Sequence, residues 1–189
     1  MKKWLIGSLV GALLLFIWQF ISWAAAGLHD PEYKYHPQQE QIMSSLSSLI
    51  KEDGQYMMPR TPPDATSEQQ QAAMKEMNGK PFAVISYKSS YEIKMAEPMI
   101  RGFLADVVIA LLMIYVLGKR TNFTVGSVWA ASLAIGFIGW LWHPYTENIW
   151  FQTPVAVLTG ALMDWFVAYT ILGLWLGWWL KRSSRVVSR

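Results

Sequence analysis

The chain has 189 residues, of which 53% are hydrophobic and 14% aromatic, and its formal net charge is +3 at pH 7. It contains no cysteine, which excludes disulfide, thiol and cysteine–metal chemistry. The apolar residues fall in four blocks, each with about the ~20 residues that a helix needs to cross a bilayer, which excludes an ordinary soluble domain. These blocks are residues 4–26, 99–118, 123–142 and 154–180.

The charges are distributed unevenly along the chain. Both ends and the turn after the second block carry basic residues and no acid: Lys2, Lys3, Lys119, Arg120, Lys181, Arg182, Arg185 and Arg189. The long segment 27–98 carries more acidic than basic residues. Lys and Arg beside membrane spans favour the cytoplasmic side. We therefore expect a bacterial inner-membrane protein with both termini in the cytoplasm and residues 27–98 in the periplasm.

The first block has features of a signal peptide and of a membrane anchor. It follows two lysines and ends at Ala24-Ala25-Ala26, as a cleaved signal does. A cleaved apolar region usually has only ~7–15 residues, whereas this one is longer and includes Trp18 and Trp23 near its end. We favour an uncleaved anchor, with residues 1–26 as the first transmembrane helix.

The segment 27–98 reads as a small insert of mixed structure. Apolar residues at helical spacing predict a helix over 37–53 that stops at Gly54. Prolines then predict a loop, and Thr66 or Ser67 can cap a second helix that ends near Met77. Residues 82–95 are rich in β-branched and aromatic residues, which predicts a strand or a short hairpin. The few large apolar side chains favour a cap on the helices over an independent domain.

The remaining blocks predict closely packed helices. The short turn at residues 118–122 predicts that the second and third spans are antiparallel neighbours. Two GxxxG patterns, at Gly7 and Gly11 and at Gly173 and Gly177, allow helix backbones to approach closely in lipid. Such patterns serve packing within one chain and between two copies equally, so a homo-oligomer or a larger membrane complex stays open. His143-Pro144 predicts the end of the third span.

Two acidic residues lie inside apolar blocks, each with small residues one helical turn away. An acid at the bilayer centre costs roughly 3 kcal/mol on insertion scales, so such residues normally face other helices or a wet cavity. At 1.5 Å per residue, Asp106 lies about 10 Å and Asp164 about 15 Å below the outer ends of their spans. Gln19 lies at a similar depth in the first span. We expect these three side chains to form one polar layer.

Other polar residues are candidates for the same layer. Ser132 and Thr159 lie at depths that would let them join it, and Arg101 and His143 stand above it. The candidate ion- or ligand-binding residues are therefore Asp106, Asp164, Gln19, Arg101 and His143.

Three hypotheses compete for the polar layer. In the first, the acids hydrogen-bond to neighbouring helices and specify their register. In the second, two nearby carboxylates share a proton or hold a cation, as in ion and proton pathways. In the third, the layer binds the head of a lipid or a quinone. Nothing in the sequence selects a particular cofactor.

The sequence gives little support for a metal site, an enzyme active site or nucleic-acid binding. His29, Asp30, His36, His143 and Glu147 belong to the outer side and suit zinc by type, but they form no compact ligand motif, so no metal site is predicted. The sequence lacks a phosphate-binding glycine loop and a nucleophile elbow, which disfavours an enzyme. The basic tail 181–189 is typical of a span anchor beside anionic lipid, and nucleic-acid binding is not supported.

Several stretches resemble a group of uncharacterised bacterial four-span integral membrane proteins. They are Glu52-Asp53-Gly54-Gln55-Tyr56-Met57-Met58-Pro59, Gly79-Lys80-Pro81-Phe82-Ala83-Val84-Ile85-Ser86-Tyr87, Met95 leading into the second span, and the stretch from Trp150 to Asp164. The resemblance implies a four-span bundle with an extracytoplasmic insert after the first span. It implies no activity and no catalytic residue.

The sequence thus predicts an all-α membrane protein, a four-transmembrane-helix bundle with a small α+β extracytoplasmic insert. Its expected parts are transmembrane helix 1 (1–26), a periplasmic cap (27–98), transmembrane helices 2–4 (99–180) and a basic cytoplasmic tail (181–189). The leading functional hypothesis is a structural or accessory membrane protein, including a subunit of a larger complex. The alternative is a small proton- or cation-coupled carrier or channel that uses the intramembrane acids.

Overall fold

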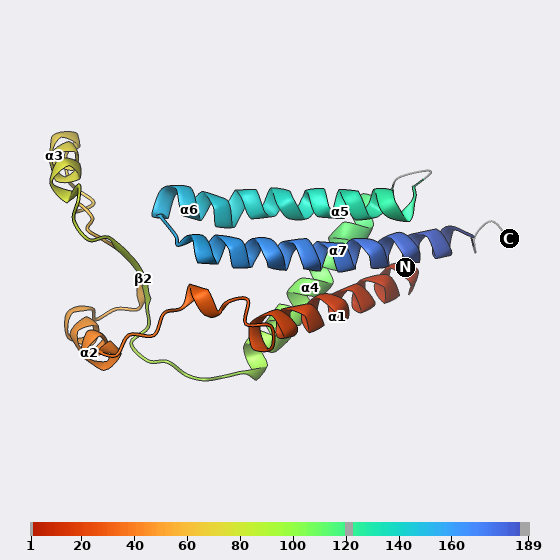
Figure 1. The fold of residues 1–189 in the computed structure, drawn as a ribbon, viewed down its shortest axis with the longest axis horizontal. Helices are drawn as coiled ribbons and strands as arrows, with labels where there is room; N and C mark the ends of the chain where they lie inside the picture. The colour runs from red at the N-terminus through yellow and green to blue at the C-terminus, as the bar shows by residue number, and fades with distance from the viewer. Residues whose placement is uncertain (1, 120–122, 186–189) are drawn as a thin grey trace. The chain divides into compact units, whose positions relative to one another are not determined.

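The computed structural model describes residues 2–119 and 123–185 of the chain (Figure 1). In chain order its elements are α1 (Lys2–Ala24), the 3-10 turn η1 (Asp30–Glu32), α2 (Gln39–Leu49), β1 (Gly54–Met58), α3 (Ser67–Met77), β2 (Ala83–Tyr87), α4 (Ala96–Leu117), α5 (Val125–Trp140), the π-helical turn η2 (Leu141–Tyr145), α6 (Thr146–Phe151) and α7 (Val155–Arg185). The predicted turn residues 120–122, which include Arg120, and the tail residues 186–189 lie outside the described residues.

Four of the helical segments are long and apolar enough to cross a membrane. They are Lys3–Ala24, Ala96–Leu117, Val125–Phe151 and Val155–Ser183. Together with one small two-stranded sheet, they make the chain a helical protein of the kind found in membranes, as the four apolar blocks predict. The chain divides into two compact units, the second of which is Tyr35–Ile93, and the first holds all four long helices together with η1, η2 and α6.

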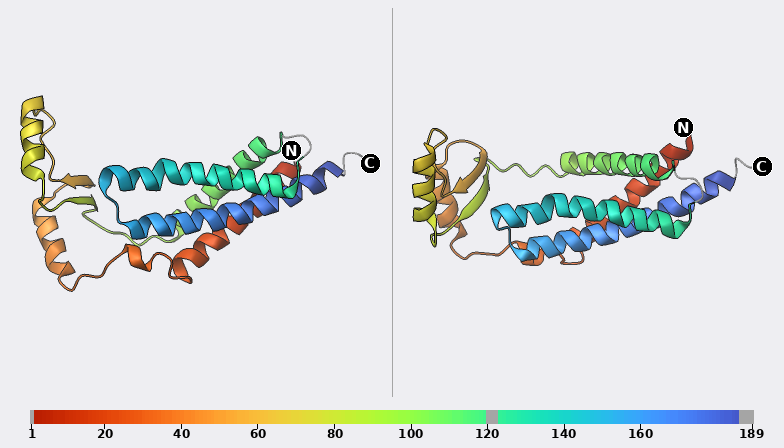
Figure 2. Two further views of the ribbon diagram at one scale, coloured as in Figure 1. Left: turned by 45° about the horizontal axis from the view of Figure 1, so that its top comes forward. Right: turned by 90° about the horizontal axis from the view of Figure 1, so that it is seen from above.

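The long helices pack as two pairs, α1 with α4 and α5 with α7, and α1 also packs against α7. Figure 2 shows α5 running beside α7 in both views. The prediction that the second and third spans are neighbours is wrong, because α4 and α5 meet only slightly. A short connection fixes where two helices meet at one end, but side-chain packing decides whether they stay together along their length.

The third span does not end at His143-Pro144, contrary to the prediction. The helix continues through η2, which contains Pro144, and then through α6 to Phe151. Proline lacks an N–H and crowds the carbonyl four residues earlier, which usually breaks an α-helix. The wider π turn accommodates it and lets the helical path continue.

The glycines of the two GxxxG patterns lie at contacts between helices of the same chain. A Cβ on Gly11 would lie 2.9 Å from a Leu172 methyl of α7, and one on Gly177 would lie 3.0 Å from the backbone of Val125 in α5. At the same end of the unit, the indole of Trp175 donates to the Gly7 carbonyl at 2.9 Å. These glycines therefore let α1 and α5 approach α7 closely, as small residues do in lipid.

The buried core lies in the half of the bundle where α4 ends and α5 begins. Its members are all apolar: Leu15, Ala110, Met113, Ile114, Leu117, Val128, Leu172 and Leu176. Asp164 and His143 lie in the opposite half, beside η1 and η2. We call these two halves the apolar half and the polar half of the bundle.

The second unit contains α2, α3 and an antiparallel pair of strands. β1 pairs with β2 in a register from Gly54 opposite Tyr87 to Met58 opposite Ala83. The strand alternative for residues 82–95 is thus confirmed, whereas a local hairpin is wrong because the partner strand lies before α3. Thr66 caps α3 in a reciprocal arrangement with Gln69, which confirms the predicted cap.

Candidate functional site

Asp106 of α4 is held by Gln19 of α1. The Gln19 amide Nε2 donates to Asp106 Oδ1 at 3.0 Å. Asp106 is only 1% exposed, and its other oxygen, Oδ2, is buried without a partner among the described residues. Counting from Ala96 at 1.5 Å per residue, the carboxyl lies about 15 Å along α4. A buried carboxyl oxygen without a hydrogen bond is costly, so this atom marks a place where a donor is missing.

Asp164 of α7 belongs to a different cluster, formed with Ser22 of α1 and His29 of the segment after α1. Ser22 Oγ donates to Asp164 Oδ1 in a very short hydrogen bond. His29 Nε2 lies 2.9 Å from Asp164 Oδ2 and 3.0 Å from Ser22 Oγ. On the other side of the ring, His29 Nδ1 lies 2.6 Å from Glu32 Oε1. Both oxygens of Asp164 therefore have partners.

The local backbone explains why His29 reaches Asp164. Gly27, at φ 61°, adopts the left-handed conformation after α1 and turns the chain back over the helix end. The Trp23 ring stacks on the His29 ring with centroids 3.8 Å apart. A Cβ on Gly160 of α7 would collide with Glu32 Oε1, so this glycine provides the space in which Glu32 lies against α7.

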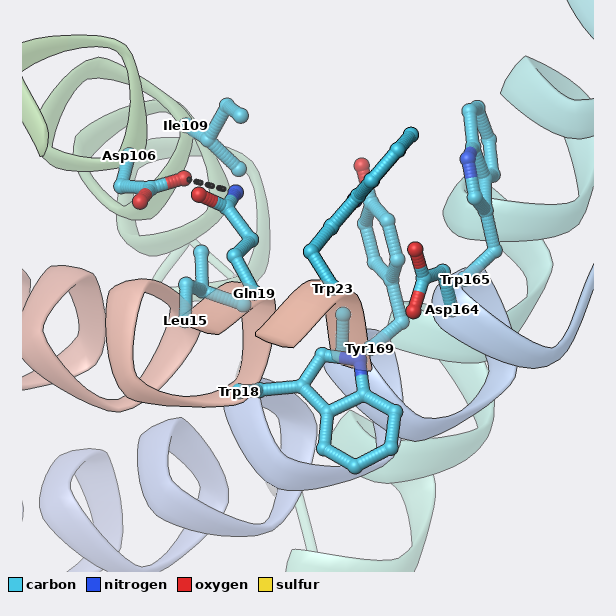
Figure 3. A pocket seen from close by; sticks show the side chains of 10 residues that line it. Leu15, Trp18, Gln19, Trp23, Asp106, Ile109, Asp164, Trp165 and Tyr169 are labelled. Atoms are coloured by element: carbon cyan, nitrogen blue, oxygen red, sulfur yellow. Dashed lines mark hydrogen bonds between the residues drawn. The ribbon is translucent and has the colours of Figure 1, made fainter. Parts of the chain in front are cut away.

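Asp106 and Asp164 line the same pocket, which has a volume of about 280 Å³ (Figure 3). Gln19 lines it as well, and Figure 3 shows it reaching across to Asp106 from another helix. Among the described residues, no hydrogen bond joins the two carboxyls. We call this the inner pocket; its remaining lining residues are Leu15, Trp18, Trp23, Ile109, Trp165, Ala168 and Tyr169.

A second pocket, of about 420 Å³, adjoins the inner one. Trp23, Asp164 and Trp165 line both pockets. We call the second one the vestibule; its other lining residues are His29, Glu32, Tyr33, His143, Pro144, Glu147, Thr153, Val157 and Ala161. In the part of the chain that the structure describes, neither pocket is lined by Lys or Arg.

The candidate residues separate into three groups. Gln19, Asp106 and Asp164 line the inner pocket, and His143 lines the vestibule. Arg101 lines neither pocket and lies exposed on α4, 3.8 Å from Glu97. Two further candidates for the polar layer bond to backbone instead: Ser132 Oγ donates to the Tyr169 carbonyl, and Thr159 Oγ1 donates to the Ala156 carbonyl.

Sequence reasoning missed Ser22 and Glu32. Ser22 follows Gln19 by three residues, which places both on one face of α1, and this spacing was a usable signal. Glu32 follows His29 by three residues, but only the turn at Gly27 and the gap at Gly160 bring it to α7. The contact of Glu32 with His29 is local, whereas its contact with α7 is a tertiary outcome.

The cluster resembles a nucleophilic triad in composition, but its geometry cannot work as one. In such a triad the histidine accepts the serine proton through a free ring nitrogen. Here Ser22 donates to Asp164 instead, and the His29 nitrogen nearest to Ser22 also lies 2.9 Å from Asp164 Oδ2. Ser22 is also fully buried, so no substrate carbonyl can reach it.

The described residues contain no group of three or more His, Asp or Glu side chains that could hold a metal ion. His29 illustrates the reason, because its two nitrogens point to Asp164 and Glu32 on opposite sides of the ring. His36, also weighed as a ligand, belongs to the second unit.

Comparisons of the chain with protein-family models, with curated proteins and with solved structures give no match. The site's chemistry is therefore argued from its own residues.

Proposed function

We propose that this chain is an accessory protein of the bacterial inner membrane that binds the polar head of an amphiphilic molecule in its inner pocket. The observation that carries the proposal is the inner pocket between three helices, where Asp106 of α4, Gln19 of α1 and Asp164 of α7 line one cavity. Carboxyl and amide groups that converge on a cavity lined by apolar side chains are typical of a ligand site.

The size and lining of the inner pocket support a small headgroup. Its volume of about 280 Å³ is just below the roughly 300–1,000 Å³ typical of pockets that enclose whole small ligands. Its walls combine aromatic and aliphatic side chains with a few converging polar groups, the usual composition of a binding site. The tail of an amphiphile would remain among the lipids.

The orientation in the membrane forms part of the proposal. The basic residues at the start of α1, at Lys119 after α4 and at the end of α7 favour the cytoplasmic side for the apolar half. The inner pocket, the vestibule and the second unit then belong to the periplasmic side, and the headgroup comes from the outer leaflet.

The apolar half of the bundle argues against the carrier or channel alternative. A conducting pathway needs polar groups or water along its whole length. The core between Leu15 and Leu117 is filled by aliphatic side chains, so the polar lining ends about halfway along the bundle. The acids therefore suit binding better than conduction.

The test is mass spectrometry of molecules that co-purify with the full chain in a mild detergent. We expect one class of amphiphile to be enriched over bulk membrane lipid and to be lost in Asp106→Asn and in Gln19→Leu. Glu97→Gln, an exposed carboxyl on the same helix, is the matched control and should keep it. Equal lipid profiles in wild type and all variants would contradict the proposal.

A further inference from the structure

We infer that the head of this amphiphile is an organic ammonium group, because the inner pocket combines an aromatic cage with carboxyl oxygens and no basic side chain. The inference rests on the proposed binding function and specifies its ligand class. It starts from the rings that line the pocket.

Four aromatic rings line the inner pocket, two from α1 and two from α7. They are Trp18, Trp23, Trp165 and Tyr169. The Trp165 and Tyr169 rings adjoin each other, with centroids 5.7 Å apart. The faces of such rings carry negative electrostatic potential and attract ammonium groups, and several rings around one cavity are the usual means of holding them.

The carboxyl groups give the pocket its charge preference. Asp106 of α4 lines the pocket, and Gln19 holds its Oδ1 in place. An ammonium group in the pocket would lie near this carboxyl group and be attracted to it. Asp164 adds a second carboxyl group from α7, although its oxygens already have protein partners. An anionic head would meet these acids without a compensating Lys or Arg.

The vestibule favours the same charge. Its lining includes the carboxyl side chains of Glu32, Glu147 and Asp164 and no Lys or Arg from the described residues. A recess lined by one sign of charge concentrates ligands of the opposite sign. The vestibule and the inner pocket share Asp164 and two tryptophans, so a cation attracted to the first would meet the wall of the second.

The experiment is a calorimetric titration of the full chain in nanodiscs of one neutral lipid. The probes are decyltrimethylammonium, neutral decanol, anionic decyl sulfate, and tetramethylammonium as a head without a tail. We expect saturable binding of decyltrimethylammonium and at least tenfold weaker binding of decanol and decyl sulfate. Tetramethylammonium should bind weakly, because it lacks the apolar tail.

Two variants test the assignment to this pocket. Asp106→Asn should weaken decyltrimethylammonium binding by about tenfold, and Trp18→Leu by roughly 2- to 30-fold, the range expected for one cation–π partner. The matched controls are Glu97→Gln for the acid and Trp142→Leu for the aromatic residue. Both control residues are exposed and line neither pocket, so their variants should bind as wild type does. Circular dichroism and size-exclusion chromatography check folding, and Trp18→Leu keeps both acids if Asp106→Asn fails to fold.

The outcomes separate this inference from the proposed function. If decanol binds as tightly as the ammonium probe, and Asp106→Asn changes neither, the ammonium inference is overturned while amphiphile binding stands. If tetramethylammonium binds as tightly as the long-chain probe, the ammonium inference stands and the amphiphile part of the proposed function fails. If wild type binds no ammonium probe, the inference is overturned regardless of which lipid co-purifies.

Discussion

At the scale of single residues, the polar side chains inside the long helices find partners on other elements. Gln19 bonds to Asp106, and Ser22 bonds to Asp164 together with His29. In a bilayer an isolated polar group finds no water to replace a lost partner, so such contacts specify which helix faces are brought together. The exceptions among the described residues are Asp106 Oδ2, Trp18 Nε1, Trp129 Nε1 and Thr170 Oγ1, which are buried without a partner.

Removing His29 should destabilise the protein. His29→Ala removes the partner that Glu32 and the partly buried Asp164 share, and leaving a buried hydrogen-bonding group without its partner costs roughly 1–3 kcal/mol. The matched control is His36→Ala, since His36 is exposed and accepts only one local hydrogen bond from the Gln38 backbone. Unfolding in mixed detergent–SDS micelles measures both free energies. Equal stability of the two variants would show that the cluster contributes little.

Asp53, outside the long helices, provides a pH-dependent contact in the second unit. The side chain and the backbone N–H of Ser89 both donate to its carboxylate, at 2.6 and 2.8 Å, and together with the nearby Lys88 they lower the pKa of Asp53. A carboxyl with a lowered folded pKa stabilises the fold above its ordinary pKa of about 4, and this contribution is lost as the pH falls through the lowered value.

Replacing Ser89 should reverse part of this shift. In Ser89→Ala the side-chain donor is gone, so the Asp53 pKa should rise toward its ordinary value, and the stability contribution should be lost at a higher pH. Carboxyl-carbon NMR of aspartate-labelled protein measures the pKa, with Asp53→Asn to assign the signal. An unchanged titration in Ser89→Ala would contradict the assigned cause.

At the scale of elements, small residues decide which segments can touch. Gly160 lets Glu32 of η1 reach α7, whereas Gly102, on the corresponding stripe of α4, has nothing within 4 Å of where a Cβ would be. Both glycines precede an acidic residue by four positions in the sequence, but only Gly160 lies against another segment.

This difference gives a paired prediction. Gly160→Ala should destabilise the protein by roughly 1–3 kcal/mol, because the added methyl group overpacks the contact with Glu32. Gly102→Ala should be neutral or stabilising by up to about 1 kcal/mol, because alanine favours a helix over glycine. Unfolding in mixed micelles measures both, and a destabilised Gly102→Ala with an unaffected Gly160→Ala would overturn the assigned contacts.

At the scale of the whole molecule, the separation into a polar and an apolar half limits what the protein can do. Proteoliposomes with the purified chain should show no proton or cation flux above that of empty liposomes, because aliphatic core residues fill the apolar half. A pH-sensitive dye and a potassium-loaded interior provide the readout. Flux that disappears in the double variant Asp106→Asn, Asp164→Asn would favour the carrier hypothesis instead.

The proposed orientation is testable because the chain has no cysteine of its own. A cysteine introduced at Ser90, in the second unit, should react with a membrane-impermeant maleimide in cells whose outer membrane has been permeabilised. A cysteine at Ser183, near the end of α7, should react only after the inner membrane is broken. The opposite pattern would reverse the orientation and place the pockets on the cytoplasmic side.

The sequence by itself determined the four long apolar helices and the two short helices of the insert. Hydrophobic length, capping residues and rise per residue are local properties, so they can be read along the chain. Only the tertiary structure decided that α4 packs on α1 and not along α5, and that Pro144 lies within a π turn. It alone joined Ser22 and His29 to Asp164, because those contacts depend on side-chain packing between segments far apart in the sequence.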